Sequence, residues 1–358
     1  MRKKKNKLNE NIEELYKKSV IRKCKIEEDI KENTRLDKYM GDRFSYYSRN
    51  KWQDLIGQGL VLLNNEKIKY TRTVKKGDEI AYHIIGMKEP DVNKDVSIIY
   101  DDGDLIIANK PADLPVIPSG KYYHNTLHTI VKNMLGCNIN MLNRIDRETS
   151  GCIVLSRSSK TASNFCAMLA GRNIIKRNII NTTERNINEK QYKKNSIKKT
   201  YIAVVENASN IEDNFIVEGY MLESGHKYYR RFQTLHKENI ESSKYSKTAF
   251  KTIKKIDDYA IVMARIYTGR MHQIRVHLYS KGLFMLGDKI YGKYGPKVFD
   301  DFIEKGIIPE NFFPRQALHA YSLEFNHPIT NEKIKVKAPL PKDLKELIKK
   351  IKNNSKNK

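Results

Sequence analysis

Residues 143–151 read NRIDRETSG and continue directly into the apolar stretch CIVLS at residues 152–156. The apolar run predicts a buried strand, and the Thr-Ser-Gly segment before it predicts a turn. Asp146 therefore lies at a turn beside the core, where a side chain can be held rigidly enough for chemistry. Taken alone, the stretch is better explained by a turn or capping aspartate. Whether Asp146 has a catalytic role has to be judged from the rest of the sequence.

The chain is strongly basic and long enough for more than one domain. It has 358 residues, with 67 Lys and Arg against 42 Asp and Glu, a net charge of +25 and a pI near 9.6. The length suggests about two domains, and the charge predicts a polyanionic partner, with nucleic acid the first candidate. No apolar run approaches the ~18 residues of a membrane span, and the basic start lacks the apolar segment of a secretory signal. We therefore expect a cytoplasmic monomer without a membrane partner.

The cysteines and histidines argue against a metal centre. The four cysteines, at positions 24, 137, 152 and 166, form no CxxC pair and no cluster with histidine, so we expect reduced thiols. His272 and His277 lack acidic or thiolate companions, and hydrogen bonding within the fold suits them better than ligation. We expect no metal and no cofactor.

Changes in composition divide the chain into five segments. One of them, the domain at residues 96–342, contains an insertion rich in Asn, Lys and Ile at about residues 172–199. The last segment has the composition of a disordered tail. In order, we expect a basic helical extension (1–33), a module of two helices and short strands whose second helix opens near Ser48 (34–85), a linker (86–95), an enzyme-sized α+β domain (96–342) and a basic tail (343–358).

Three further stretches place polar residues beside apolar strands. Asn109-Lys110-Pro111 ends one strand, and Tyr201 begins another, where a half-buried core position is the ordinary interpretation of a tyrosine. After Thr268-Gly269 the sequence fits a helix that ends at Lys281-Gly282. An alternating strand fits this segment almost as well, and in either case Arg275 projects beside or opposite an apolar face.

Basic residues and short motifs alternate in a fixed order over residues 34–85. Arg-Leu-Asp-Lys at 35–38 precedes Ser-Arg at 48–49, Ile-x-x-Gly-x-Val at 56–61 and Val-Lys-x-Gly-Asp-x-Ile at 74–80. This order resembles the S-four-type RNA-binding domain. The resemblance implies a small helical face that docks on the RNA backbone by shape and charge. The residues expected to contact RNA there are Arg35, Lys38, Arg49 and Lys51.

A longer series of blocks follows over residues 96–340. It comprises NKP at 109–111, RIDRETSG at 144–151, KTY at 199–201, TGRMHQIRVH at 268–277, GDKIYG at 287–292 and LHA at 318–320. The series resembles the RluA-type family of RNA pseudouridine synthases, and accidental agreement across so many ordered blocks is very improbable. The resemblance implies an α+β fold, in which a catalytic domain with a mixed, mainly antiparallel sheet is flanked by helices and loops and joined to a small N-terminal RNA-binding domain.

The resemblance also implies an activity and a role for individual residues. The family isomerises uridine to pseudouridine without a cofactor, and its essential aspartate, a nucleophile or an initiating base, corresponds to Asp146. Arg275 matches the arginine that keeps this acid ionised, and Tyr201 matches the tyrosine that stacks on the target base and could remove the proton from carbon 5. The uridine has to be flipped out of its helix, and Arg144 matches the arginine that inserts in its place. The other residues expected to contact substrate or RNA are Asn143, Thr149, Ser150, Lys110, Arg270, His272 and Gln273.

Three positions depart from the family pattern, and the target stays open. Asn143 replaces the usual histidine, Ile145 replaces leucine, and Asp113 replaces a glycine, which leaves the geometry of its loop undetermined. Large-subunit ribosomal RNA is the expected substrate and transfer RNA the alternative. A ribosome-assembly factor that binds RNA without turnover is a second hypothesis. Glycoside hydrolysis is a third, and it would require a second carboxylate, for which Glu148 is the nearby candidate.

Overall fold

The computed structural model describes residues 20–27, 29–44, 47–84, 89–119, 122–169, 197–225, 232–307, 309 and 312–356. The first 19 residues and nearly all of the insertion expected at 172–199 lie outside this part of the chain. The chain forms two compact units. The N-terminal unit comprises Met1–Pro90 with Ser119–Tyr123, and the C-terminal unit comprises Asp91–Pro118 with His124–Lys358.

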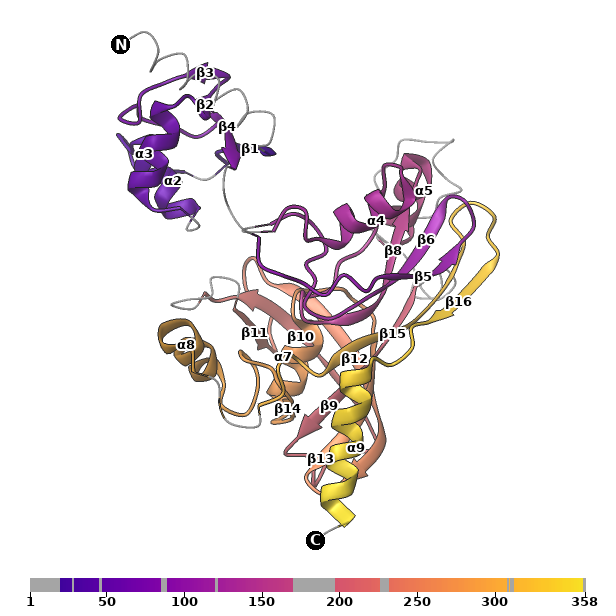
Figure 1. The fold of residues 1–358 in the computed structure, drawn as a ribbon. Coiled ribbons are helices and arrows are strands. Elements are labelled where there is room, and N and C mark those ends of the chain that lie inside the picture. The colour runs from indigo at the N-terminus through magenta and orange to yellow at the C-terminus, as the bar shows by residue number, and fades with distance from the viewer. Residues whose placement is uncertain are drawn as a thin grey trace. The chain divides into compact units, whose positions relative to one another are not determined.

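The N-terminal unit is a small sheet covered by two helices (Figure 1). Its core consists of apolar residues from both helices and the sheet, including the fully buried Trp52 and Met40. The Ser48 hydroxyl caps the second helix by accepting from the Lys51 N–H, at 3.3 Å, as expected from the sequence. The strand order is β1-β4-β2-β3, and the elements are β1 (Val20–Lys25), α2 (Leu36–Arg43), α3 (Arg49–Gly57), β2 (Val61–Leu63), β3 (Glu66–Lys67) and β4 (Glu79–Ile84).

Strand β1 corrects the expectation that residues 1–33 form one helical extension. Residues 20–25 pair antiparallel with β4 over their whole length, and Ile26 is buried in the core of the unit. Isoleucine and valine favour a strand once an unpaired sheet edge is available, and that edge is supplied by residues about 60 positions further along the chain.

The C-terminal unit is built on a mixed, mainly antiparallel sheet of twelve strands, as the resemblance implied. The main order is β11-β10-β12-β13-β9-β15-β8-β6-β5; β8 and β15 are parallel, whereas the other neighbours in this order are antiparallel. Figure 1 shows β5, β6 and β8, which form one end of the strand order, beside helices α4 and α5, and it shows α9 beside the central strands β9 and β13. The strands are β5 (Ser97–Asp101), β6 (Leu105–Lys110), β7 (Asn140–Met141), β8 (Ser150–Ser156), β9 (Lys198–Glu206), β10 (Asn214–Glu223), β11 (Gln233–His236), β12 (Lys244–Ile256), β13 (Tyr259–Ile266), β14 (Phe284–Met285), β15 (Leu318–Asn326) and β16 (Lys333–Lys337), and the helices are α4 (Leu127–Leu135), α5 (Ser159–Leu169), α7 (Gln273–Ser280), α8 (Pro296–Lys305) and α9 (Lys342–Lys356).

Helix α7 resolves the alternative left open by the sequence in favour of a helix. It ends at Ser280, and Gly282 adopts a left-handed conformation with φ +71°, which lets the Leu283 N–H donate to the Leu278 carbonyl at 3.0 Å. Arg275 therefore lies in the first turn of a helix whose next residues are buried.

Helix α9 corrects the expectation of a disordered basic tail. Leu344 is fully buried and Ile351 nearly so, in a cluster that also contains Val204 and Ile256. The tail is lysine-rich, but its apolar residues recur every three to four positions, and the sheet offers them a surface to cover. Burial of that apolar stripe offsets the entropy of ordering the helix, which a composition average cannot register.

Candidate active site

Asp146 lies in the turn between β7 and β8, and two glycines bring the surrounding segments close together. The Thr149 N–H donates to the Asp146 carbonyl at 3.1 Å, which closes the turn. A Cβ on Gly151, where φ is +111°, would lie 2.2 Å from the Ala320 carbonyl oxygen, and one on Gly287 would lie 1.9 Å from that of Arg315. Only glycine allows these backbones to approach so closely, so the turn of Asp146 is held against β15, and the segment that carries Asp288 is held against the loop that precedes β15.

Arg275 links Asp146 to a second, buried aspartate. Its Nη1 donates to Asp146 Oδ2 at 2.9 Å, while Nε and Nη2 donate to Asp288 at 2.6 and 2.8 Å. Asp288 in turn accepts the N–H groups of Ile290 and Tyr291 at 2.9 Å each. The guanidinium is also stacked 5.0 Å from the ring centre of Tyr291. This fork geometry fixes Arg275 in one orientation, which a lysine could not reproduce.

Gln316 is a member of the site that sequence reasoning missed. Its Nε2 donates to Asp146 Oδ2 at 3.2 Å and to Thr149 Oγ1 at 2.6 Å, and its side chain is buried. Arg275 and Gln316 both bond Oδ2, and among the residues that the structure describes none donates to Oδ1. Oδ1 is therefore the oxygen left for a reacting group. The position of Gln316 two residues before the Leu-His-Ala block was the available signal.

The environment keeps Asp146 ionised. Burial raises the pKa of this carboxyl, but the charges of Arg275 and His272 and the hydrogen bonds from Arg275 and Gln316 outweigh it, so that the pKa falls below its usual 3.8. The same carboxylates act on the guanidinium. Burial lowers the pKa of Arg275, and Asp288 and Asp146 raise it well above its ordinary range. The pair is therefore charged at neutral pH.

Tyr201 lies near Asp146, on β9. Burial raises the pKa of the Tyr201 phenol, and the negative charge of Asp146 raises it further. The proton accordingly stays on this tyrosine at neutral pH. Ile145, the neighbour of Asp146, packs against the same apolar cluster as Tyr201, which brings the turn and the strand together.

Comparison with known proteins identifies the chain. A family model described as RNA pseudouridylate synthase matches residues 104–280, and the model of the S4 domain matches residues 34–80. Ribosomal large subunit pseudouridine synthase D of Nitrosomonas europaea is 26% identical over 329 residues, which cover 89% of this chain and 85% of that protein. The chain belongs to the RNA pseudouridylate synthase family.

Two further similarities agree with this membership. The mitochondrial tRNA pseudouridine(32) synthase of Saccharomyces cerevisiae is 28% identical over 270 residues, which cover 73% of this chain and 52% of that protein. The solved structure of Human RNA Pseudouridylate Synthase Domain Containing 4 matches with a TM-score of 0.50 at 18% identity, over 71% of this chain and 92% of that one. The latter supports the fold alone. The family and fold class predicted from the ordered blocks are confirmed.

Of the five buried residues that we expected to touch RNA, four bond other groups of the fold in this pseudouridylate synthase, and His272 is the fifth. The Lys110 ammonium is fully enclosed and donates to three carbonyls, of Pro111, Leu114 and Arg147, at 2.8 Å each. Thr149 accepts from Gln316, and the Ser150 hydroxyl is 2.9 Å from His319 Nδ1. The fourth is Gln273, whose amide bonds Thr268, Arg270, Lys247 and Thr248. In this structure the polar atoms of these side chains satisfy groups inside the fold, as buried polar groups usually do, and their contact with RNA stays a prediction.

The remaining expected contacts have different degrees of access. Arg144 and Arg270 are exposed, and Arg270 Nε donates to the Tyr245 carbonyl at 2.8 Å. Asn143 accepts the Val154 N–H at 2.7 Å, a bond that its amide oxygen provides. His272 is largely buried, with Nδ1 3.1 Å from the Tyr291 hydroxyl, and bears on Asp146 through its charge.

Asp113, one of the departures from the family pattern, adopts a backbone conformation that glycine favours. Its φ is +58°, in the left-handed region, and its carboxylate pairs with Arg147 Nε at 3.0 Å. Aspartate tolerates this region better than most residues. The Arg147 carbonyl also accepts from Lys110 and from the Leu114 N–H, at 2.8 and 3.2 Å, so the 110–114 loop stays joined to the turn of Asp146.

The basic residues of the N-terminal unit surround one buried acid. Asp37 is fully buried and accepts from Arg35, Arg49 and Gln53, at 3.0 to 3.1 Å for the arginines and 2.6 Å for the glutamine. Lys38 and Lys51 are exposed nearby on the same two helices. Asp37 thus orients two guanidinium groups at the surface of the unit, and contact of Arg35, Lys38, Arg49 and Lys51 with RNA stays a prediction.

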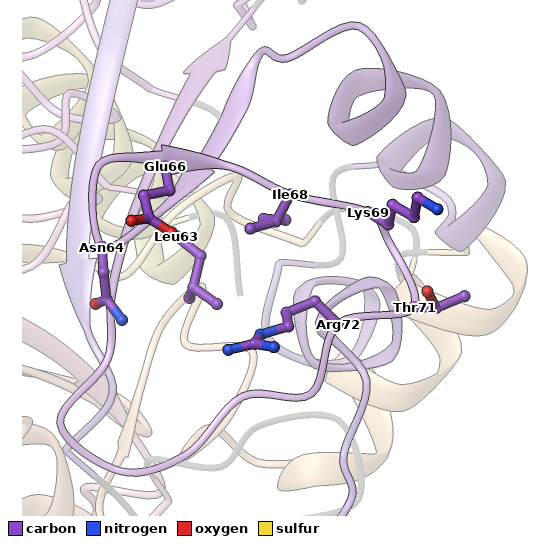
Figure 2. A pocket seen from close by; sticks show the side chains of 7 residues that line it. All are labelled: Leu63, Asn64, Glu66, Ile68, Lys69, Thr71 and Arg72. Atoms are coloured by element: carbon purple, nitrogen blue, oxygen red, sulfur yellow. The ribbon is translucent and has the colours of Figure 1, made fainter.

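The N-terminal unit has a hollow of about 380 Å³, and Figure 2 shows the side chains that line it. It is lined by Leu63, Asn64, Glu66, Ile68, Lys69, Thr71 and Arg72. Its lining combines one acidic and two basic side chains with polar and apolar ones, and we assign no ligand to it.

Within the described ranges, no group of three or more His, Cys, Asp or Glu side chains could hold a metal ion, and the four cysteines are free thiols. None of the helices that the structure describes is both long and apolar enough to span a membrane.

Proposed function

We propose that this pseudouridine synthase isomerises uridines of large-subunit ribosomal RNA, with Asp146 as the residue that initiates the reaction. The observation that carries the proposal is the placement of Asp146: ionised, fixed through Oδ2 by Arg275 and Gln316, and with Oδ1 left open. A turn or capping aspartate needs no buried guanidinium that is itself held by a second acid.

The isomerisation makes defined demands on the site. The bond between ribose C1′ and the base nitrogen breaks, the base rotates, carbon 5 bonds to C1′, and the hydrogen on carbon 5 leaves as a proton while the nitrogen gains one. Asp146 begins this sequence either as a nucleophile or as a base. Its fixed orientation and charge supply a reactive carboxylate without reorganisation at the moment of reaction.

Tyr201 and Arg144 act on the base rather than on the sugar bond. Because its pKa is raised, Tyr201 serves better as a stacking surface for the flipped uracil than as a phenolate base at neutral pH. The Arg144 guanidinium is exposed, and among the residues that the structure describes it forms no ion pair, so it is available to occupy the space that the uridine leaves.

The choice of ribosomal over transfer RNA rests on the N-terminal unit and on the relatives. An appended RNA-binding unit with arginines ordered by Asp37 suits a large folded RNA, and the relative named as a ribosomal large subunit enzyme spans nearly all of the chain. The yeast enzyme named for transfer RNA matches a smaller share of this chain. Glu148 does not supply a second free carboxylate for glycoside hydrolysis, because it accepts from Lys289 Nζ and from the Gln316 N–H.

The test is product formation by Asp146→Asn. We expect tritium release from RNA labelled at carbon 5 of uridine to stop while RNA binding is retained, since the shape is kept and the charge is lost. Asp113→Asn is the matched control, because it removes an exposed carboxylate from the same unit and should leave release unchanged. Undiminished release by Asp146→Asn would refute the role of this residue, and an inactive parent protein would favour an RNA-binding assembly factor. Mapping pseudouridines in cells that lack the protein then decides between ribosomal and transfer RNA.

A further inference from the structure

Helix α9 covers the sheet with one face and presents regularly spaced lysines on another. Leu344 and Ile351 are buried, and Leu347 and Ile348 are partly buried against the same cluster. The apolar face of the helix is therefore occupied by the protein itself.

The exposed side of α9 carries a stripe of four lysines, at positions 345, 349, 352 and 356. Spacings of four, three and four residues place them within roughly 60° around the helix axis and over about 16 Å along it, one helical turn apart. All four are exposed, and within the part of the chain that the structure describes they form no ion pair. By contrast, Lys342 pairs with Glu346, at 3.8 Å.

We propose that this lysine stripe, Lys345, Lys349, Lys352 and Lys356, binds the phosphate backbone of the RNA substrate as a second docking surface, additional to the N-terminal unit. The inference rests on the proposed function in so far as the substrate is RNA. Four like charges along one side of a helix create a local positive potential, and the closely spaced phosphates of an RNA strand are a partner of opposite charge that can lie along it. Lysine, as a point charge on a flexible stem, contacts phosphate without reading sequence.

The buried apolar face decides between RNA and an anionic membrane. A basic amphipathic helix binds a membrane by inserting its apolar side below the headgroups. In α9 that side is packed on Val204, Ile256 and Ala317 and cannot insert without leaving the sheet. Only the positive charge of the exposed lysines is then left to bind a partner, and such a surface suits a polyanion in solution.

The helix is also joined to the segment that carries the active site. Asp343 at its start accepts from Arg315 Nε and Nη2 at 2.6 and 3.0 Å, and Arg315 Nη1 donates to the Glu148 carbonyl at 3.3 Å. Glu148 lies two residues after Asp146. RNA held along α9 is therefore held at a fixed place relative to the catalytic turn, within one rigidly packed unit.

The test compares two neighbouring lysines in the full-length protein. Lys349→Gln removes a charge from the stripe, whereas Lys350→Gln removes an equally exposed charge about 100° around the helix. Glutamine and lysine have similar helix propensities, so α9 should persist in both, as circular dichroism can verify. Binding of in vitro transcribed large-subunit ribosomal RNA is measured by filter retention over a range of salt concentrations. The triple variant Lys345→Gln/Lys349→Gln/Lys352→Gln amplifies the effect.

For Lys349→Gln we expect the slope of log affinity against log salt to become shallower by about 0.7–0.9, which is about 4- to 5-fold weaker binding at ~0.15 M salt. For the triple variant the same arithmetic gives a change in slope of about 2–3 and about 50-fold weaker binding or more. KM should rise while kcat at saturating RNA stays constant, because these lysines touch no reacting atom. Lys350→Gln should match the parent protein.

Three results would overturn the inference. The first is an equal loss of RNA affinity in Lys349→Gln and Lys350→Gln, which would indicate diffuse surface charge. The second is an unchanged RNA affinity in the triple variant. The third is a triple variant that no longer binds phosphatidylserine vesicles but keeps its RNA affinity. Failure of the stripe is distinguishable from failure of the proposed function. In the first case the parent protein still releases tritium and Asp146→Asn does not; in the second the parent releases none, while the difference between the two lysine variants persists.

Discussion

Replacing Arg275 by methionine should unfold the catalytic unit more easily and abolish turnover, for two separable reasons. The arginine is 7% exposed, Asp288 is fully buried, and Asp146 is 29% exposed. Removing one partner from a buried ion pair costs about 3–5 kcal/mol, because the charge left behind is uncompensated. Asp288 should dominate this loss, since Asp146 retains access to water. Loss of the cation beside Asp146 should lower kcat by about 100-fold or more, the effect of a missing active-site donor.

The double variant Arg275→Met/Asp288→Asn separates the two effects. Asparagine keeps an oxygen for the N–H groups of Ile290 and Tyr291 but carries no charge. We expect the free energy of unfolding to return to within about 1–2 kcal/mol of the parent value, since a neutral replacement of a buried pair is often tolerated. Turnover should not return, because Asp146 still lacks its partner. Arg270→Met, an exposed arginine from the same block, is the control and should change stability by less than about 0.5 kcal/mol.

The spectroscopic probe has to suit the unit that is perturbed. The single tryptophan of the chain, Trp52, lies in the core of the N-terminal unit, so its fluorescence reports on that unit and should not change between variants. Urea unfolding of the C-terminal unit should be followed by far-UV circular dichroism, with the two transitions fitted separately. A single variant within ~1 kcal/mol of the parent, or a double variant that regains pseudouridine formation, would refute the reasoning.

Three further predictions concern the surroundings of Asp146. Gln316→Leu should lower kcat by about 10- to 100-fold with little change in KM, since one hydrogen bond to a charged group is lost; single-turnover kinetics measure this, and an unchanged kcat would exclude Gln316 from positioning the acid. Because the folded-state pKa of Asp146 is depressed, kcat/KM should stay level from neutral pH down to the usual pKa of 3.8 and fall only below it. The stability that this carboxylate contributes should likewise be lost as pH falls through the folded-state pKa. A fall in kcat/KM near pH 6 would contradict the assignment. Asp113→Gly should be nearly neutral in thermal unfolding, because relief at φ +58° offsets the loss of an exposed ion pair, whereas Asp113→Ala should be destabilised by about 1 kcal/mol; equal melting temperatures for the two variants would count against strain at this position.

Part of the candidate site was readable from the chain, and part was not. The ordered blocks predicted that Asp146, Arg275 and Tyr201 belong together, and the structure places Arg275 against Asp146 across 129 positions of sequence. The same blocks led us to assign RNA contact to Lys110, Thr149, Ser150 and Gln273, which are buried. A motif records that a residue type recurs at a position, but it does not record whether the side chain faces a ligand or the inside of the fold. Gln316 lay just outside a block and Asp288 lay inside the block at 287–292 without an assigned role, and their bonds to Asp146 and Arg275 form only when the segments that carry them meet.

The sequence by itself determined the family, the mixed α+β fold, the turn that holds Asp146 and the basic character that predicts RNA, because these depend on local order and composition. Tertiary structure decided which polar groups are buried, that residues 20–25 complete a sheet, and that residues 342–356 form a helix rather than a tail. The physical reason is the same in each case. A strand edge, an apolar surface or a buried carboxylate becomes available only after distant segments have packed, and the free energy that it then provides exceeds any local preference.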